Sequence, residues 1–244
     1  VLPGAPAAVG RLRVAGAAVA FFPNNSSEPA GAVATRLADS GIPCAERDVM
    51  TSAGAAAELL VRELGVGASV LACAGPGVGD GLVRRGLEAV DAFPADAVVV
   101  GWHRDFDFEA LDRASDAVRR GALFVATNLD ATYPVPGGLV PGNGALVAAV
   151  AVASGREPTV AGKPHEPAVA LVRDRFAGRG VVIGDRPSTD GAFADALGWD
   201  FALVRSAVTH TPDEEAWGGR GTLAGDSLVE VVDGIIAGLG AGPT

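Results

Sequence analysis

The sequence has few cysteines and histidines, and these shortages exclude two kinds of site. Cys44 and Cys73 are the only cysteines among 244 residues and form no CxxC pair, so no disulfide framework is expected. We interpret both as buried thiols of a protein in a reducing compartment. His103, His165 and His210 are far apart and lack the spacing of metal ligands, which argues against a zinc site.

Long apolar runs and excess positive charge are also missing. No run approaches the roughly 20 apolar residues of a membrane span, and no basic segment precedes an apolar stretch at the start. Twenty-nine acidic against nineteen basic residues give a net charge of −10, which repels nucleic-acid backbones and anionic bilayers. We therefore expect a cytoplasmic protein with neither nucleic acid nor membrane as a partner.

Lysine is the rarest charged residue, because Lys163 is its single occurrence. Lysine carries a compact point charge on a flexible stem, whereas arginine presents a rigid planar fork. Lys163 thus marks a position that requires an ammonium group, with codon bias as the alternative explanation.

What the sequence does contain is a repeated pattern of short β-branched runs, turns rich in glycine or proline, and amphipathic stretches. This alternation predicts an α/β fold. The expected strands are Ala17–Phe22, Ser69–Ala74, Ala97–Gly101, Leu123–Thr127, Gly180–Gly184 and Phe201–Arg205. The expected helices are Ala5–Ala15, Pro29–Ser40, Ser52–Leu64, Gly79–Leu87, Phe108–Arg120, Gly144–Ser154, Pro167–Phe176, Asp190–Leu197 and Ser227–Leu239.

Two strand-end loops carry groups suited to an anion. Asn24, Asn25 and Ser26 lie between an expected strand and a helix, where backbone N–H groups can hold a phosphate. Alternatively, these residues only turn the chain and cap the helix. Lys163 lies in a second such loop, where its charge can bridge a carboxylate and a phosphate.

A third loop carries two carboxylates. Asp185 follows the expected strand Gly180–Gly184, and Asp190 comes five residues later at a helix start. Paired acids on such a loop suit a hard cation such as Mg²⁺, which prefers oxygen ligands. The alternative is that Asp185 is a turn residue and Asp190 an N-cap.

These runs together resemble the NagD-like, class IIA branch of the haloacid dehalogenase (HAD) superfamily of phosphatases. The matching segments are FFPNNSS, VVVGWHRDF, ATNLDATYP, GLVPGNGALVAA, AGKPHEP and GDRPSTD. The resemblance implies a Rossmann-like HAD core, made of residues 1–67 and 157–244, and an inserted α/β cap of the C2 type at 68–156. It also implies Mg²⁺-dependent hydrolysis of small phosphate monoesters, such as those of polyols, sugars or glycolate, through an aspartyl-phosphate intermediate.

The resemblance assigns roles to the residues of the three loops. Lys163 would steady both the nucleophile and the phosphate, and Asn24, Asn25 and Ser26 would line the phosphate cradle. Asp185 would hold Mg²⁺, and Asp190 would support the metal shell.

The cap contributes two further candidates. Trp102 and Tyr133 fall where the family faces the leaving group, so they would shape the substrate range. Their alternative role is ordinary packing in the cap core.

Two departures from the family pattern leave other interpretations open. The family's first motif, Asp-x-Asp-Gly, holds the nucleophile and is expected before Val1; the string Asp105-Phe106-Asp107 lacks the glycine and is interpreted as a decoy. Pro23 stands where the family has a hydroxyl donor, and proline offers neither hydroxyl nor N–H. A catalytically silent HAD-like protein that binds a phosphorylated ligand or partner is therefore the alternative. If the sequence were complete, its sheet would lack a central strand, and exposed edges would favour instability or a homo-oligomer.

Overall fold

The computed structural model describes residues 2–205 and 222–240, which form two compact units. Unit 1 comprises Val1–Phe21, Ala34–Val49 and Val172–Thr244, and unit 2 comprises Phe22–Val33 and Met50–Leu171. Unit 2 therefore extends beyond the cap expected at 68–156 on both sides, and the division between core and cap stays a prediction. His210 lies outside the described residues.

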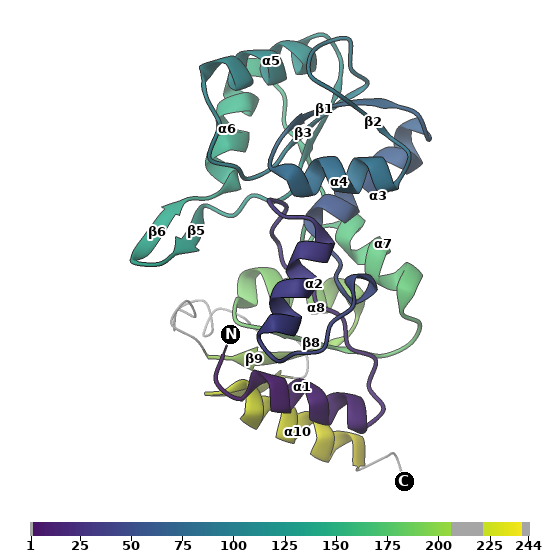
Figure 1. Ribbon diagram of the computed structural model, residues 1–244, viewed down its shortest axis with the longest axis vertical. Coiled ribbons are helices and arrows are strands. Elements are labelled where there is room, and N and C mark those ends of the chain that lie inside the picture. Colours follow the sequence, from purple (N-terminus) through teal and green to yellow (C-terminus); the bar gives the residue numbers. More distant parts are fainter. Residues whose placement is uncertain (1, 206–221, 241–244) are drawn as a thin grey trace. The chain divides into compact units, whose positions relative to one another are not determined.

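Unit 2 is built around a parallel sheet (Figure 1). Its elements are α3 (Ser52–Leu64), β1 (Ser69–Cys73), α4 (Pro76–Arg84), β2 (Glu88–Val90), β3 (Ala97–Val100), α5 (Phe108–Arg119), β4 (Leu123–Ala126), β5 (Thr132–Val135), β6 (Gly138–Pro141), α6 (Asn143–Ser154) and β7 (Thr159–Val160). Five strands pair in the order β2-β1-β3-β4-β7, all parallel, and β5 and β6 form a separate antiparallel hairpin.

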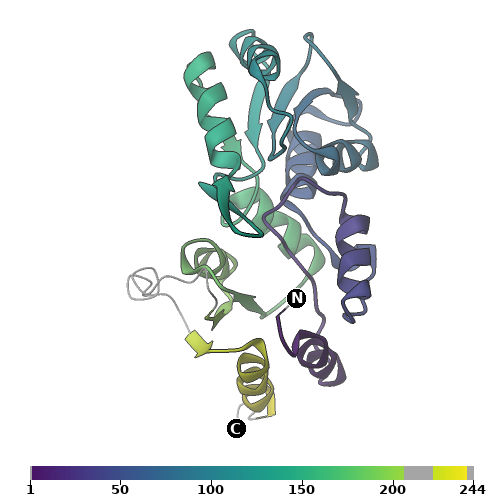
Figure 2. The same ribbon diagram turned by 60° about the vertical axis from the view of Figure 1, so that its left-hand side comes forward.

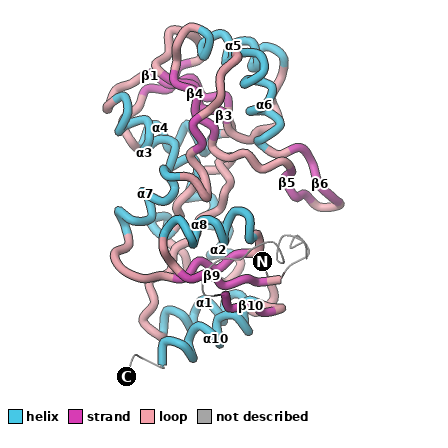
Figure 3. The backbone as a smooth tube through the Cα atoms, turned by 180° about the vertical axis from the view of Figure 1, so that it is seen from behind, coloured by secondary structure: helices cyan, strands magenta, loops and turns pink. Residues whose placement is uncertain are grey.

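Helices cover both faces of this sheet because its strands are apolar on both sides. Val99 and Val125 pack with residues of α3 and α4, and the alternate positions Val98 and Phe124 pack with residues of α5 and α6. Figure 3 shows these helices around the sheet from behind. Because β3, β4 and β7 run parallel, the loops that follow these three strands lie at the same edge of the sheet.

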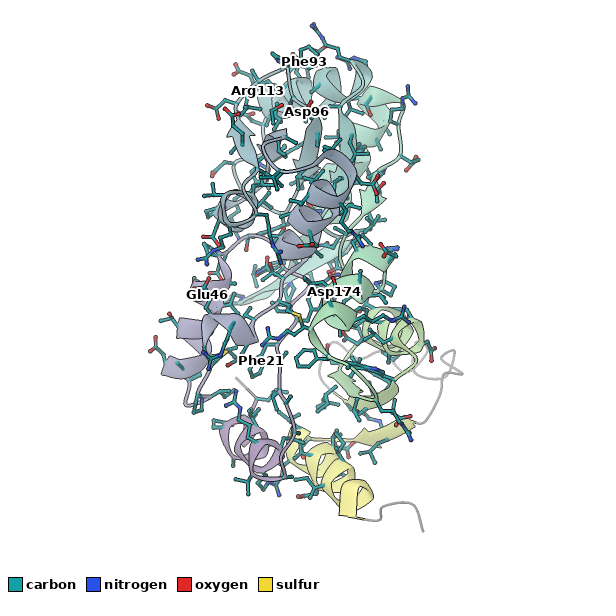
Figure 4. The ribbon with its side chains drawn as sticks, turned by 90° about the vertical axis from the view of Figure 1, so that its right-hand side faces the viewer. Phe21, Glu46, Phe93, Asp96, Arg113 and Asp174 are labelled. Atoms are coloured by element: carbon teal, nitrogen blue, oxygen red, sulfur yellow. The ribbon has the colours of Figure 1, made fainter. Side chains whose placement is uncertain are left out.

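At the opposite edge, where β3 begins, Asp96 ties β1 and β3 together. Its Oδ2 accepts hydrogen bonds from both the N–H and the hydroxyl of Ser69, each 2.8 Å long. These bonds hold the pKa of the Asp96 carboxyl below its usual value, with the backbone N–H of Ser69 as the largest cause. Asp96 lies at this end of unit 2 together with Phe93 (Figure 4).

Unit 1 contains a smaller sheet. Its elements are α1 (Ala5–Val14), a short 3-10 helix (Glu46–Asp48), β8 (Val181–Gly184), a π turn (Pro187–Gly191), α8 (Ala192–Leu197), β9 (Asp200–Val204), β10 (Thr222–Gly225) and α10 (Leu228–Gly240). The strands pair in parallel in the order β10-β9-β8. Helices α1 and α10 lie side by side (Figure 2) and pack through Ala8, Leu12 and Val232 against Ile183. Two further helices, α2 (Ala30–Asp39) and α7 (Glu166–Arg175), have residues in both units.

The expected α/β class is confirmed, and the expected strand Ala17–Phe22 is wrong. Within the described residues this segment makes one parallel bridge, between Phe21 and Val49, in which the Phe21 N–H donates to the Asp48 carbonyl at 2.8 Å. A strand requires a series of such bonds to a neighbouring strand, and this segment makes a single bridge.

Other differences are local. Helix α4 begins at Pro76, before the expected Gly79, because proline suits the first helical position. Helix α8 begins at Ala192 because the π turn takes up the preceding residues, Asp190 among them. The pattern missed five short strands, β2, β5, β6, β7 and β10, of two to four residues each. No described helix is long and apolar enough to cross a membrane.

The two cysteines differ in exposure. Cys73 is buried at the end of β1, as expected, and burial raises the pKa of its thiol to about 11. Cys44 is only half-buried, which corrects the expectation that both thiols are inside. Burial and the nearby Asp48 carboxylate raise the pKa of the Cys44 thiol as well.

We predict that a thiol reagent at pH 8 modifies Cys44 long before Cys73. A pKa of about 11 leaves roughly one Cys73 thiol in a thousand ionised at pH 8, and burial blocks access as well. Mass mapping of the two peptides over time measures both rates, and Cys44→Ser is the control that removes the fast reaction. Equal rates in the native protein would contradict the prediction, whereas equal rates in denaturant are expected.

Candidate functional site

Asn24 and Lys163, two of the residues selected from the sequence, are in direct contact in unit 2. The Asn24 side chain bonds to both backbone groups of Lys163: Oδ1 accepts from its N–H at 3.0 Å, and Nδ2 donates to its carbonyl oxygen at 3.4 Å. The Asn128 side chain in turn donates to the Asn24 carbonyl oxygen at 2.8 Å. The polar loop at 24–26 and the lysine loop are therefore joined through an amide side chain.

Asn25 makes different contacts. Its Oδ1 accepts from the Ser27 N–H at 2.9 Å, which closes a tight turn, and its Nδ2 donates to the Tyr133 hydroxyl at 3.4 Å. Tyr133 lies in the β5–β6 hairpin, opposite Val140. The structure thus connects the polar loop to one of the two aromatic candidates of the expected cap.

Ser26 is fully buried. Its Oγ lies 2.8 Å from the Thr127 Oγ1, and the Asn143 side chain donates to the same Thr127 oxygen at 3.4 Å. The Ser26 hydroxyl therefore anchors the polar loop to Thr127. This leaves the backbone of Ser26 as the part of the residue that can bind a ligand.

Three glycines allow the polar loop to lie close to its neighbours. A Cβ on Gly77 would come within 2.3 Å of the Glu28 carbonyl oxygen, and one on Gly101 would come within 2.8 Å of the Ser26 Oγ. A Cβ on Gly75 would likewise press on the backbone of Ser27. Only glycine fits at such distances, so the loop is fixed by backbone contact with the start of α4.

The lysine loop is held by the same kind of contact. Strand β7 pairs with β4, and the Ala161 N–H continues the ladder to the Ala126 carbonyl at 2.8 Å. A Cβ on the next residue, Gly162, would lie 2.3 Å from the Asn24 Oδ1 and 2.4 Å from the Thr127 carbonyl oxygen. The Lys163 Nζ lies 5.8 Å from the centre of the Phe22 ring, within the range of a cation–π contact.

Trp102 and Tyr133 stack on each other. Their ring centres are 4.2 Å apart with an angle of 16° between the planes, and the Trp102 Nε1 donates to the Pro141 carbonyl at 2.9 Å. Both side chains are partly exposed, and the Arg104 guanidinium lies 5.9 Å from the Trp102 ring centre. The pair forms an aromatic surface at the base of the hairpin.

Asp185 and Asp190 lie in unit 1, at the end of β8 and in the π turn. Asp190 is 7% exposed, and its Oδ2 accepts from the Arg186 N–H at 3.2 Å. A Cβ on Gly184 would lie 2.4 Å from the Asp190 carboxyl carbon, so glycine at the strand end makes room for this side chain.

These two carboxylates supply hard oxygen donors. Within the described ranges no group of three or more His, Cys, Asp or Glu side chains is placed to hold a metal. Carboxylate oxygens are nevertheless the donor type that Mg²⁺ prefers, and the ion keeps several waters in its octahedral shell.

Sequence reasoning missed three polar residues that support the polar loop, namely Thr127, Asn128 and Asn143. The available signal was the position of Thr127 and Asn128 directly after the apolar run of β4. Asp107 caps α5 by accepting from the Ala110 N–H at 2.8 Å. One of the two aspartates of the Asp105-Phe106-Asp107 string therefore has a structural role.

Comparison with known families gives two matches. A family model described as haloacid dehalogenase-like hydrolase matches residues 1–88, and one described as HAD-hydrolase-like matches residues 160–231.

Characterised proteins match over most of the chain. The D-glycerol 3-phosphate phosphatase of Mycobacterium tuberculosis is 40% identical over 198 residues, which cover 79% of this chain and 56% of the relative, so the chain spans little more than half of that protein. The acid sugar phosphatase of Staphylococcus saprophyticus is 34% identical over 216 residues, which cover 87% of this chain and 83% of the relative.

Solved structures of phosphatases superpose on most of this chain. The glycerol phosphate phosphatase of M. tuberculosis, crystallised with magnesium, superposes with a TM-score of 0.86 and 36% identity, covering 93% of this chain and 71% of the other. A p-nitrophenyl phosphatase from Archaeoglobus fulgidus gives a TM-score of 0.87 and 29% identity, covering 96% and 92%.

We predict that Gly162→Ala destabilises the protein. The added Cβ would overlap the Asn24 side chain and the Thr127 carbonyl, and overpacking of this kind typically costs about 1–3 kcal/mol. The matched control is Gly79→Ala in α4, where a Cβ meets nothing within 4 Å and helix propensity should stabilise by roughly 0.5–1 kcal/mol. Urea denaturation measures both; equal stability of the Gly162 variant and the parent would refute the proposed steric constraint.

Proposed function

Because the chain belongs to the NagD-like phosphatases of the haloacid dehalogenase-like hydrolases, we propose that it is part of an enzyme that hydrolyses small phosphate monoesters with Mg²⁺. Relatives named for glycerol phosphate, acid sugars and p-nitrophenyl phosphate support this substrate class. The proposed partner is a small phosphorylated metabolite of the polyol or sugar type.

The contact between Asn24 and Lys163 carries this proposal. Phosphoryl transfer requires positioned positive charge and N–H donors around the phosphate. The contact joins the chain's single lysine to the polar loop that the family uses for phosphate. If the loop at Asn24–Ser26 only capped a helix, it would not need hydrogen bonds to the distant Lys163 segment.

Each group has a role in the proposed reaction. The N–H groups of the loop at Asn24, Asn25 and Ser26 bind the phosphate oxygens, and Lys163 neutralises charge on the phosphate and its nucleophile. Asp185 would hold Mg²⁺, with Asp190 supporting it. When bound, the cation would supply positive charge for phosphoryl transfer.

The nucleophile belongs to the family's first motif, which is not among these 244 residues. The activity is therefore proposed for a protein that carries that motif together with this chain. There, an aspartate oxygen would bond to phosphorus as the ester P–O bond breaks, and the alcohol would leave with a proton from the motif's general acid. Water would then hydrolyse the aspartyl phosphate and release inorganic phosphate.

Pro23 favours a second candidate function, a silent protein that binds a phosphorylated ligand. Proline removes both a hydroxyl and an N–H donor from the cradle. Loss of one donor of this kind lowers turnover by roughly 10²–10³-fold in enzymes that stabilise an oxyanion. Phosphate release from the protein with its first motif distinguishes the two candidates.

We predict that Lys163→Ala and Asp185→Asn each lower Mg²⁺-dependent phosphate release by at least about 10²-fold. Each substitution removes one charge that the proposed reaction requires and leaves the residue's backbone in place. The assay uses p-nitrophenyl phosphate and glycerol phosphate, and circular dichroism checks folding. Near-normal turnover in either folded variant would exclude the role given to that residue.

The aromatic surface should govern substrate choice. We predict that Trp102→Ala changes kcat/KM for p-nitrophenyl phosphate relative to glycerol phosphate by about tenfold, because it removes a stacked ring from the proposed leaving-group site. Phe108→Ala is the matched control, since the Phe108 side chain is 81% exposed at the start of α5. An unchanged ratio in the Trp102 variant would place the aromatic pair outside the substrate site.

A further inference from the structure

We propose that Asn24 is a positioning residue for Lys163 and that its side chain does not itself bind the phosphate. This inference rests on the proposed function, because it assigns Asn24 a role within the same site. The Asn24 Oδ1 accepts from the Lys163 N–H, and the two N–H donors of its Nδ2 face the Lys163 carbonyl oxygen and the Asp130 carboxylate, so the side-chain amide is used within the protein. Asn24 would act on the reaction by fixing where the lysine side chain begins.

Lys163 lies just past regular structure. The ladder between β7 and β4 ends with the bond from the Ala161 N–H to the Ala126 carbonyl, and the residue after Lys163 is a proline, which has no N–H. Beyond the ladder, the two Asn24 bonds take the place of a neighbouring strand by pairing with both the N–H and the carbonyl of one residue. Gly162 permits this pairing, since any Cβ there would overlap the Asn24 Oδ1.

Asn24 is itself held from a second segment. The Asn128 side chain, 3% exposed, donates to the Asn24 carbonyl oxygen at 2.8 Å, and the Asn24 Nδ2 lies 3.5 Å from both carboxylate oxygens of Asp130. The Asn128 Oδ1 accepts from the Asp130 N–H at 3.0 Å, which orders this segment. Asn128 thus holds the Asn24 backbone, and the Asn24 side-chain amide lies between Lys163 and Asp130, as a positioning role requires.

The ammonium group of Lys163 shares this region with the polar loop. Its Nζ lies 5.8 Å from the centre of the Phe22 ring, two residues before Asn24. Asn24 therefore fixes the backbone of a lysine whose charge lies beside the start of the phosphate loop. The neighbouring Asn25 bonds to Ser27 and Tyr133 instead, so two adjacent residues of the same type have separate roles.

The single lysine makes this inference testable without an activity assay. Amine modification followed by mass spectrometry of the peptide that contains Lys163 reports the environment of that residue alone. The protein carrying this chain would be compared with Asn24→Ala and with Asn25→Ala as the matched control. Labelling would be measured across pH with and without inorganic phosphate as the probe.

We expect Asn24→Ala to change the labelling rate of Lys163 by on the order of tenfold and to weaken its protection by phosphate, because a positioned charge loses its support. Asn25→Ala should leave the labelling rate without phosphate within about twofold, because its side chain does not bond to Lys163. In the assay, Asn24→Ala should lower kcat, and adding it to Lys163→Ala should cause no further loss.

An unchanged labelling rate in a folded Asn24→Ala variant would overturn the inference, whether or not the protein is a phosphatase. If labelling changes as expected but the unaltered protein releases no phosphate, the proposed function fails and the positioning of Lys163 stands. Should Asn24→Ala not fold, Asn24→Ser takes its place, because its short hydroxyl side chain adds no charge and cannot bond to both backbone groups of Lys163. That variant should likewise change the labelling rate, and no change would also count against the inference.

Discussion

The pairing of the Asn24 side chain with the backbone of Lys163 joins positions 139 residues apart, and the rest of the proposed phosphate site depends on it. A backbone N–H and carbonyl beyond the end of a strand require partners, and an asparagine side chain supplies both kinds in one group. Because the partner belongs to the polar loop, one interaction satisfies the backbone of the lysine loop and brings the two loops together. The support from Asn128 makes a third segment part of the same network.

The close approach of these segments restricts side-chain volume as much as it requires hydrogen bonds. At Gly77, Gly101 and Gly162, a Cβ would lie within 2.8 Å of an oxygen of the polar loop or its neighbours, and at Gly184 it would overlap the Asp190 carboxyl. Gly77 lies in the first turn of α4, and the other three lie at or just past the ends of strands. There the absence of a side chain lets one polar segment rest directly on another.

Local patterns predicted most of the fold but could not reveal the network. The apolar run at Val98–Val100 formed a strand because burial on both faces favours such runs, and Val181–Gly184 and Ser52–Leu64 formed the expected strand and helix. Ala17–Phe22 reads as a strand from its composition, yet strand formation also requires a paired neighbour, which no local pattern specifies. Short strands such as β5 and β6 contain Pro134 and Pro141, which obscure their alternation.

The sequence indicated the residues of the candidate site but not the separate role of each. Asn24, Asn25 and Ser26 look equivalent as small polar residues, and only their partners distinguish them: Lys163 for the first, Tyr133 for the second and Thr127 for the third. Thr127 and Asn128 follow a strand as the other candidates do, but nothing in their types indicated that they support a loop a hundred residues earlier.

The separate roles of these side chains restrict how the polar loop can hold an anion. Pro23 has no N–H, and the Ser27 N–H already donates to the Asn25 Oδ1 at 2.9 Å, which leaves the N–H groups of Asn24, Asn25 and Ser26 as the candidates for phosphate. The buried Ser26 hydroxyl bonds to Thr127. A cradle with so few donors depends more strongly on a charged side chain, since a charge-assisted bond is about twice as strong as a neutral one. Lys163 is the only lysine in the chain, so the loss of donors at Pro23 increases the importance of placing Lys163 correctly.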